Sequence, residues 1–234
     1  MENELEMKIS EVIQRTYNVK SFRLGVEKEL DYKAGQFLYA SLKTEKGCKR
    51  YLSISSSPTE KGYIEFTKKI TQSDFSTALN NFKPGEIITV QYPMGNFTLK
   101  EGYSKIAFLS GGIGITPIRS ICKYATDNKL DTDIILAYAN RSIKDIAFKE
   151  DFDDMQKQNH KLKVTHVLSE SAQGFKCTVG HISAQVIKNE VPDYSQRKFY
   201  LCGPPQMVEA MKKMLLDELS LPKEGIITEG FQGY

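Results

Sequence analysis

The segment "FLSGGIGITPIRSI", residues 108–121, decides the fold class of this 234-residue chain. It joins an apolar run to three glycines and then to a helix-forming sequence, which is the order of a β-strand that enters an α-helix through a tight turn. Thr116 stands where a helix N-cap is expected, and Pro117 suits the first helical position. Because a helix N-terminus attracts anions, the segment predicts either a plain strand-to-helix turn or a phosphate-binding loop.

Two common phosphate-binding motifs are excluded by the residues themselves. The loop lacks the G-x-x-x-x-G-K-[ST] pattern of nucleoside triphosphate hydrolases. It also departs from the dinucleotide pattern G-x-G-x-x-G, because a proline replaces the last glycine and no acidic residue follows about twenty positions later. The next apolar run ends instead in Asn140 and Arg141.

The chain after Gly102 alternates short apolar runs with helix-forming segments. The expected strands are "KIAFLSGG", "DIILAYAN", "KLKVTHVLS" and "KFYLCG", and the expected helices are "PIRSICKYATDN", "FKEDFDDMQKQN", "HISAQVIKNE" and "PQMVEAMKKMLLDEL". This alternation predicts a doubly wound α/β domain with a parallel sheet. Cys202 ends one of these strands beside two prolines, at the edge where open α/β sheets bind ligands, although a lone strand cysteine is more often a core residue.

Before residue 99 the apolar residues are spaced differently. Short alternating apolar runs separated by turn residues, including "AGQFLYASLKT", "YIEFTKKI", "EIITVQYPM" and "NFTL", predict an antiparallel sheet or barrel. One short helix is expected in "SDFSTALNNF", capped by Ser73 or Ser76. We therefore expect two domains, at residues 1–100 and 101–234.

Composition limits the possible functions. The formal net charge of +3, without a run of five basic residues, gives no support for nucleic-acid binding. No signal peptide and no run of 18 apolar residues is visible, so we expect a cytoplasmic protein without a membrane span. The four cysteines are far apart, which predicts free thiols and no zinc or iron–sulfur site.

Six motifs, in the correct order, resemble the ferredoxin–NADP⁺ reductase superfamily. They are "AGQF" at 34–37, "RYLSISS" at 50–56, "SDFST" at 73–77, "YPMGNF" at 92–97, "GGIGITP" at 111–117 and "CGPPQMVEAM" at 202–211, followed by "TEGF" near the end. The resemblance implies a six-stranded antiparallel flavin barrel followed by a Rossmann-like NAD(P) domain, as a stand-alone module without a fused ferredoxin domain.

The same resemblance implies the site residues. Those expected at the flavin are Arg50, Tyr51, Leu52, Ser53, Ser55, Ser56, Thr67, Lys68, Ser73, Phe75, Ser76 and Thr77. Those expected at the nucleotide are Gly111, Gly112, Ile113, Gly114, Thr116, Pro117, Arg141, Glu170, Cys202, Gly203, Pro204 and Met207. Ser53, Cys202 and Glu229 are expected at the reacting centre, and Phe231, with Tyr234 as a rival, is expected to cover the second flavin face.

Two positions depart from the family pattern. Leu52 stands where the family has an aromatic residue that stacks on the flavin, and Ser73 replaces the glycine of a G-x-x-S loop. Strand alternation places Arg50 and Leu52 on one face and Tyr51 on the other. The missing aromatic predicts weaker flavin binding, by about tenfold for a stacking term of about 0.5–1.5 kcal/mol, unless contacts elsewhere compensate.

The implied activity is hydride transfer from NAD(P)H to a bound flavin, with FAD favoured over FMN. Glu170 disfavours a 2′-phosphate, so NADH is preferred over NADPH, although Arg141 argues the other way. The electron acceptor is expected to be a separate protein or small molecule. The alternatives are a flavin reductase that uses free flavin as its substrate, and a non-catalytic flavin- or nucleotide-sensing module or regulatory subunit.

Overall fold

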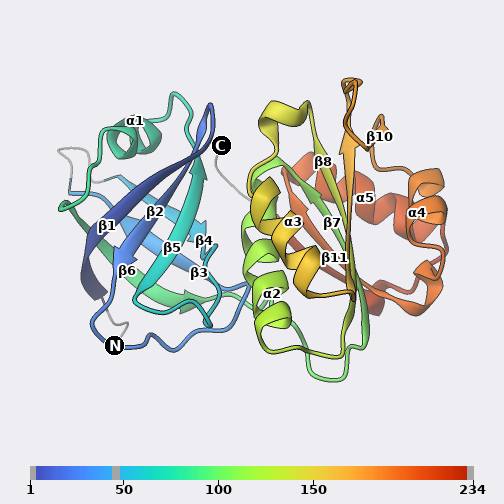
Figure 1. Ribbon diagram of the computed structural model, residues 1–234, viewed down its shortest axis with the longest axis horizontal. Coiled ribbons are helices and arrows are strands. Elements are labelled where there is room, and N and C mark those ends of the chain that lie inside the picture. The colour runs from blue at the N-terminus through green and yellow to red at the C-terminus, as the bar shows by residue number, and fades with distance from the viewer. Residues whose placement is uncertain (1–3, 44–47, 231–234) are drawn as a thin grey trace.

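The computed structural model describes residues 4–43 and 48–230, which form two sheets side by side (Figure 1). The first sheet contains β1 (Glu4–Thr16), β2 (Val19–Gly25), β3 (Phe37–Ser41), β4 (Lys49–Ser53), β5 (Tyr63–Lys69) and β6 (Ile87–Met94). Its order is β4-β3-β6-β1-β2-β5, and the paired strands are antiparallel. The predicted six-stranded antiparallel sheet is confirmed.

The barrel does not close completely. β4 and β5 are the two edges of the sheet, and the isolated bridge between Ile54 and Phe66 is the pairing that joins this side of the barrel within the described ranges. Along the rest of β4 the outer backbone edge faces no strand of this sheet. Unpaired strand edges carry free N–H and C=O groups, so this gap offers hydrogen bonds to a bound molecule.

A short helix covers one end of the barrel. α1 (Asp74–Asn80) begins at Ser73, whose hydroxyl accepts a hydrogen bond from the backbone N–H of Ser76. Of the two serines considered as the cap, Ser73 is therefore the one used. Phe75 and Leu79 extend from the helix into the apolar interior of the barrel.

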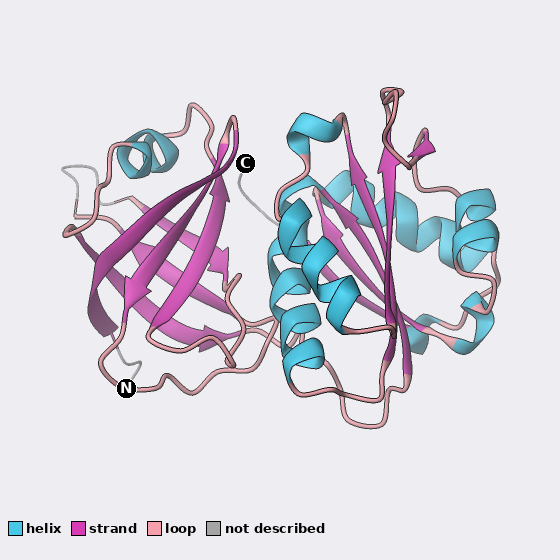
Figure 2. Cartoon of the chain, in the orientation of Figure 1, coloured by secondary structure: helices cyan, strands magenta, loops and turns pink. Residues whose placement is uncertain are grey.

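The second sheet is parallel throughout. It contains β7 (Lys105–Gly111), β8 (Asp133–Asn140), β9 (Leu162–Leu168), β10 (Thr178–Val179), β11 (Lys198–Gly203) and β12 (Ile226–Gly230), in the order β10-β9-β8-β7-β11-β12. α2 (Ile115–Asp127) and α3 (Lys149–Gln158) cover one face, while α4 (Ala184–Glu190) and α5 (Pro205–Asp217) cover the other (Figure 2). Short 3-10 turns lie at Gly112–Gly114, Ile143–Asp145, Tyr194–Gln196 and Lys223–Gly225. The predicted doubly wound domain is confirmed.

The structure corrects three details of the sequence reading. The turn Gly112–Gly114 runs directly into α2, so Thr116 and Pro117 are its second and third residues and not its cap and first residue. The segment "NFTL" is not a strand, because Phe97 packs into the core between the sheets instead of pairing with a neighbour. β10 and β12 were not predicted, since β10 has only two residues and β12 mixes polar and apolar positions.

The two sheets meet across α2, at a point where a glycine is required. Gly35 has a φ of +96°, and a Cβ there would collide with the carbonyl oxygen of Phe97 and lie 2.9 Å from Cδ1 of Ile121 on α2. The turn before β3 therefore lies directly against the helix, with no room for a side chain.

Gly35→Ala should destabilise the protein more than Gly62→Ala does. Gly62 has a similar φ of +84° but no atom within 4 Å of its Cβ position, so it reports backbone strain alone, about 1–2 kcal/mol. The collision at Gly35 should add roughly 1–3 kcal/mol. Urea unfolding of both variants measures the difference, and equal losses would show that the junction can widen freely.

Candidate active site

The two glycine- and proline-containing loops found in the sequence lie against each other. A Cβ on Gly114 would collide with the carbonyl of Cys202, and one on Gly111 would collide with the sulfur of Met207. The close approach is possible because β7 and β11 are neighbours in register, with Ser110 opposite Cys202. Both loops follow the carboxyl ends of parallel strands, where α/β sheets bind ligands.

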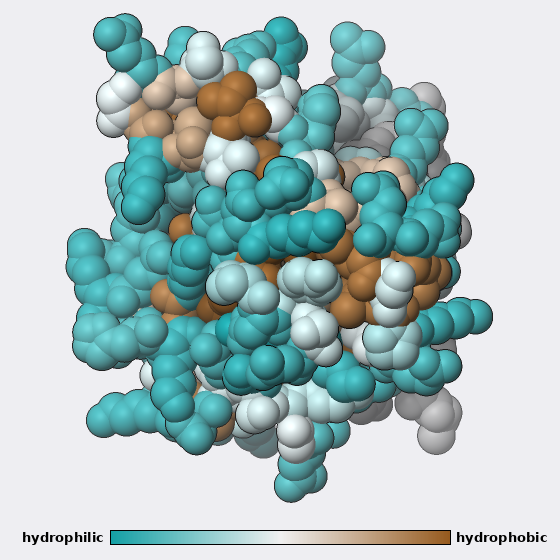
Figure 3. Space-filling view, turned by 90° about the vertical axis from the view of Figure 1, so that its right-hand side faces the viewer, coloured by the Kyte–Doolittle hydropathy of each residue, from teal (hydrophilic) through white to brown (hydrophobic). Residues whose placement is uncertain are grey.

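A cleft of about 620 Å³ opens beside these loops. Its lining includes six of the predicted nucleotide residues, namely Gly111, Gly112, Ile113, Arg141, Pro204 and Met207. Ile182, Met211 and Met214 make the side toward α4 and α5 apolar, and apolar surface is visible on this face of the molecule (Figure 3). Of the other predicted nucleotide residues, Gly114, Thr116, Pro117 and Cys202 are buried behind the loops, and Gly203 and Glu170 are outside the lining.

The barrel also contributes to this cleft, through residues that the sequence analysis missed. Asn18 comes from the turn between β1 and β2, Val19 is the first residue of β2, and Lys69 is the last residue of β5. Successive side chains of a strand point to opposite faces, so Lys69 lies on the other face of β5 from the predicted residue Lys68. This alternation is the signal that could have identified Lys69. A lysine facing the glycine loop adds positive charge where a pyrophosphate would lie.

Arg141 and Glu170 form an ion pair. In the sequence, Glu170 favoured NADH as the nucleotide, whereas Arg141 favoured NADPH. Nε of Arg141 donates to Oε1 of Glu170 at 2.7 Å, and both side chains are largely exposed. The hydrogen bond to Glu170, together with its charge, raises the pKa of Arg141. Each charge is therefore partly neutralised by the other.

Cys202 and Glu229 lie next to each other at the sheet edge. They are register partners on β11 and β12. Burial raises the pKa of Glu229 to about 7. Burial, with a smaller effect from Glu229, raises the pKa of Cys202 well above its usual value, so this side chain remains a neutral thiol at neutral pH.

Glu229 reaches across to the barrel. Its Oε1 lies 3.7 Å from the Cβ position of Gly95, which also touches the ring of Phe37, and Phe37 is the register partner of Ser53. The hydroxyl of Ser53 and Oε2 of Glu229 are both buried without a hydrogen-bond partner. Buried polar atoms nearly always have partners, so the two orphaned groups fit a polar cofactor ring placed between the sheets.

Two cations gather at the other end of β4. The guanidinium of Arg50 lies 6.0 Å from the ring centre of Phe75 on α1. Burial, followed by the charges of Arg50 and Lys69, lowers the pKa of Lys68. Two neighbouring cations beside a gap in the barrel suit a bound diphosphate, which is the anionic part of FAD.

Several residues predicted at the flavin have other roles in the structure. The Ser55 hydroxyl bonds Glu65 and Thr67, and the Ser56 hydroxyl bonds Tyr32 and the backbone N–H of Glu65. The backbone amides of both serines donate to the Glu65 carbonyl. These hydroxyls and amides, and the hydroxyl of Thr67, are therefore bonded within the protein, and the contact of Ser55, Ser56 and Thr67 with a flavin stays a prediction.

Leu52 lies in the interior of the barrel. It shares a face with Arg50, as predicted, but it is only 5% exposed, belongs to the barrel core and lies opposite Leu38. Tyr51 is on the other face, 64% exposed and packed against the rings of Phe37 and Tyr39. Leu52 therefore packs in the barrel interior, and its contact with a flavin stays a prediction.

The remaining predicted flavin residues belong to α1 or lie outside the description. The Ser73 and Ser76 hydroxyls bond each other, while Thr77 is exposed. Phe231 and Tyr234 lie outside the described residues.

Two family models match different parts of this chain. Residues 5–99 match the family model described as "Oxidoreductase FAD-binding domain", and residues 108–213 match "Oxidoreductase NAD-binding domain". NADH-cytochrome b5 reductase 1 of Dictyostelium discoideum is 32% identical over 206 residues, which cover 83% of this chain and 71% of that protein.

Other relatives are longer than this chain. The glycine betaine monooxygenase reductase subunit of Pseudomonas aeruginosa is 29% identical over 87% of this chain, but the match spans only 58% of that subunit. The cytochrome b5 reductase domain of Ulva prolifera nitrate reductase has the same fold, with a TM-score of 0.86, 22% identity and 97% of each chain covered. In the part of the chain that the structure describes, no helix has the length and apolar character needed to cross a membrane.

The raised pKa of Glu229 predicts a pH-dependent stability for the protein without ligands. The folded state holds this proton more tightly than the unfolded state, where the pKa is 4.5, so ionisation destabilises the fold as pH rises from about 4.5 through about 7. Glu229→Gln cannot ionise, and its Tm should therefore rise relative to wild type across this interval and level off above it. Exposed Glu224→Gln is the control, and parallel Tm curves for wild type and Glu229→Gln would contradict the assignment.

Proposed function

Since the chain belongs to the ferredoxin–NADP⁺ reductase superfamily, we propose that it is an NAD(P)H-dependent reductase that delivers electrons through bound FAD to a separate acceptor. We assign FAD to residues 1–100 and the nicotinamide nucleotide to residues 101–234. The acceptor is a redox protein or a small molecule, in keeping with relatives that are named as reductase components.

One observation carries the proposal. Ser53 at the end of β4 and Glu229 near the end of β12 come from different sheets, yet each has a buried polar atom without a hydrogen-bond partner. Glu229 approaches Gly95, whose Cβ position touches Phe37, the register partner of Ser53. Cys202 lies beside Glu229, at the edge that carries the nucleotide loops. A flavin ring and a nicotinamide meeting here would each be bordered by one half of the chain.

The residues of the chain supply orientation and proton control. FAD supplies, when bound, the capacity to accept a hydride and release electrons. Ser53 can donate its hydroxyl hydrogen bond to a ring nitrogen, and Glu229, with a pKa of about 7, can hold or release a proton at Oε2 near neutral pH. Cys202 is a buried, neutral thiol beside Glu229, and we assign it to the nicotinamide side of the site.

NADH is the proposed donor, with NADPH as the alternative. Glu170 follows β9 at the edge of the sheet, where its carboxylate would repel a 2′-phosphate. The ion pair leaves Arg141 with less charge to offer that phosphate.

A flavin reductase that binds free flavin as a substrate is the second candidate. Leu52 favours it, because a residue packed in the barrel core lends no aromatic face to hold the ring. A non-catalytic sensor is the third candidate, and the presence of Cys202 and Glu229 side by side at the sheet edge argues against it.

The colour of the purified protein separates these functions. A yellow preparation that NADH bleaches in the absence of oxygen, with turnover when an acceptor is added, is the expected result. A colourless protein that oxidises NADH only with added flavin would identify a flavin reductase. No bleaching and no turnover with either nucleotide would contradict both enzymatic functions.

Arg50→Ala should weaken FAD binding, whereas Lys49→Ala should not. Arg50 lies beside Lys68 and α1, while Lys49 alternates to the opposite face of β4. Loss of a charge-assisted contact costs about 1.5–3 kcal/mol, or roughly 10- to 100-fold in Kd. Fluorescence titration of each apoprotein with FAD measures the effect, and equal affinities in the two variants would exclude Arg50 from the phosphate site.

A further inference from the structure

Helix α2 contacts both halves of the candidate site. Its N-terminus continues from the glycine turn Gly112–Gly114. One turn further along, Arg119 and Ser120 reach the barrel segment 55–60, which begins two residues after Ser53. The helix is therefore attached to the nucleotide loop at one point and to the exit of the flavin strand at another.

The side chain of Arg119 is nearly buried and contacts four groups, which are the Ser55 carbonyl, Glu60, Asp151 and the ring of Phe148. Its side chain is 6% exposed. Nη1 donates to the carbonyl of Ser55 at 3.1 Å, and the guanidinium forms a two-pronged pair with Glu60, in which Nη2 and Oε1 are 3.0 Å apart. Nε and Nη2 both donate to Oδ2 of Asp151 on α3, at 2.9 and 2.7 Å, and the ring of Phe148 lies 5.6 Å away.

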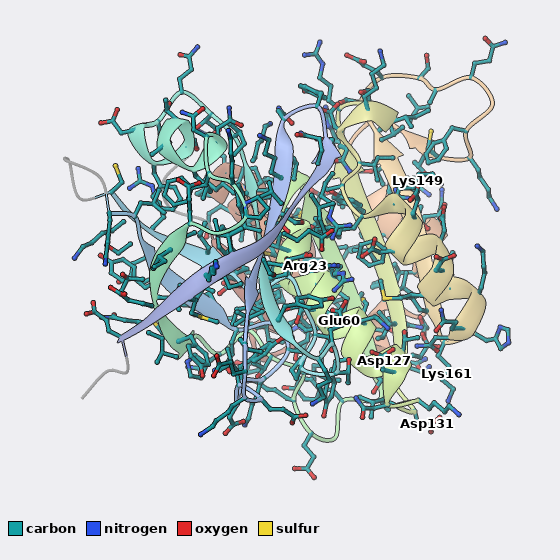
Figure 4. All side chains as sticks on the ribbon, turned by 60° about the vertical axis from the view of Figure 1, so that its left-hand side comes forward. Arg23, Glu60, Asp127, Asp131, Lys149 and Lys161 are labelled. Carbon is teal, nitrogen blue, oxygen red and sulfur yellow. The ribbon has the colours of Figure 1, made fainter. Side chains whose placement is uncertain are left out.

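The charges of this cluster belong to different parts of the chain. Glu60 is on the barrel, whereas Asp151 is on the parallel-sheet side (Figure 4 shows Glu60 in front of α2). Burial alone would raise the pKa of Glu60, but Arg119, together with hydrogen bonds from Ser57 and Tyr63, holds the pKa below its usual value. Arg15 forms a second cross-junction link, to Glu65 at 3.1 Å and to Asp151 at 3.6 Å.

Ser120 adds an independent contact. Its hydroxyl donates to the carbonyl of Ser56 at 2.6 Å, and both residues are fully buried. Two consecutive residues of α2 thus bind two consecutive carbonyls of the segment after β4. Because these are backbone carbonyls, the contacts fix the path of the chain two and three residues beyond Ser53.

We propose that Arg119, assisted by Ser120, is a positioning residue that holds the Ser53 half of the site in register with the Cys202–Glu229 half. The inference rests on the proposed reductase function. Hydride transfer depends steeply on the placement of its partners, and a displacement of about 1 Å can cost about 100-fold in rate. Stability by itself does not explain the arrangement, since buried ion pairs are often no more stabilising than apolar replacements.

Arg119→Lys is the most informative substitution. Lysine keeps the positive charge, but it has no planar fork and cannot bind Glu60, Asp151 and the Ser55 carbonyl together. We expect the single-turnover rate of flavin bleaching at saturating NADH to fall about 10- to 100-fold. The Kd for FAD and the KM for NADH should change less than threefold.

Arg23→Lys is the matched control. Arg23 pairs with Glu11 and Glu65, which both belong to the barrel, so its loss disturbs the same charge network without releasing the junction. Its bleaching rate should equal that of wild type. An equal loss of rate in both variants would show a general effect of charge and overturn the proposal.

A measurement without cofactors tests the same idea independently of activity. Amide hydrogen exchange of residues 54–62 and 112–118 in the apoprotein should be faster in Arg119→Lys than in Arg23→Lys, because the segment and the helix are no longer tied. If Arg119→Lys does not fold, Ser120→Ala is the substitute, because it removes only the bond to the Ser56 carbonyl. It should lower the bleaching rate and speed the amide exchange, each by less than expected for Arg119→Lys.

The outcomes separate this inference from the reductase function. Wild type that NADH does not bleach would refute the function itself. Bleaching of wild type together with normal rates and normal exchange in Arg119→Lys and Ser120→Ala would refute the positioning role alone. Loss of FAD binding equal to the loss of rate would make Arg119 part of the cofactor site and would also overturn the proposal.

Discussion

One apolar core joins the two sheets, and the geometry of the site depends on it. Val19, Ala34 and Phe97 from the barrel side belong to the same cluster as Ile118 of α2 and Tyr200 of β11. The rings of Phe97 and Tyr200 meet edge to face at 5.3 Å. Because packed interiors allow little displacement, this core limits how far the free edge of the barrel can move relative to the carboxyl edge of the parallel sheet.

The unpartnered polar atoms follow from the same constraint. Within the described ranges, buried side-chain atoms without a hydrogen bond occur at Ser53, Ser110, Asn140, His166 and Glu229. All of these except His166 lie in the last two residues of a strand. These strand ends therefore carry polar groups that the protein alone does not satisfy, as expected where a ligand completes the structure.

Local rules predicted the elements well but not the role of every side chain. Ser73 caps α1 as expected from the hydroxyl preference at helix starts, and alternation correctly separated Leu52 from Tyr51. The resemblance to a flavin motif, and not a local rule, predicted Ser55 and Ser56 at the cofactor, and the structure shows their hydroxyls bonded to Glu65, Thr67 and Tyr32. A hydroxyl-rich segment looks the same in the sequence whether its partners are a cofactor or the protein itself.

The sequence by itself determined the different apolar spacing of the two halves, the order of most strands and helices, and the glycines and prolines of the two loops. These depend on spacing, side-chain shape and backbone freedom, which are local properties. Only the tertiary structure decided that Gly114 lies against Cys202, that Glu229 reaches Gly95, and that Arg119 binds Glu60 and Asp151 at once. Each of these contacts joins residues far apart in the chain, and their distances are set by how two cores pack around α2, which no local pattern encodes.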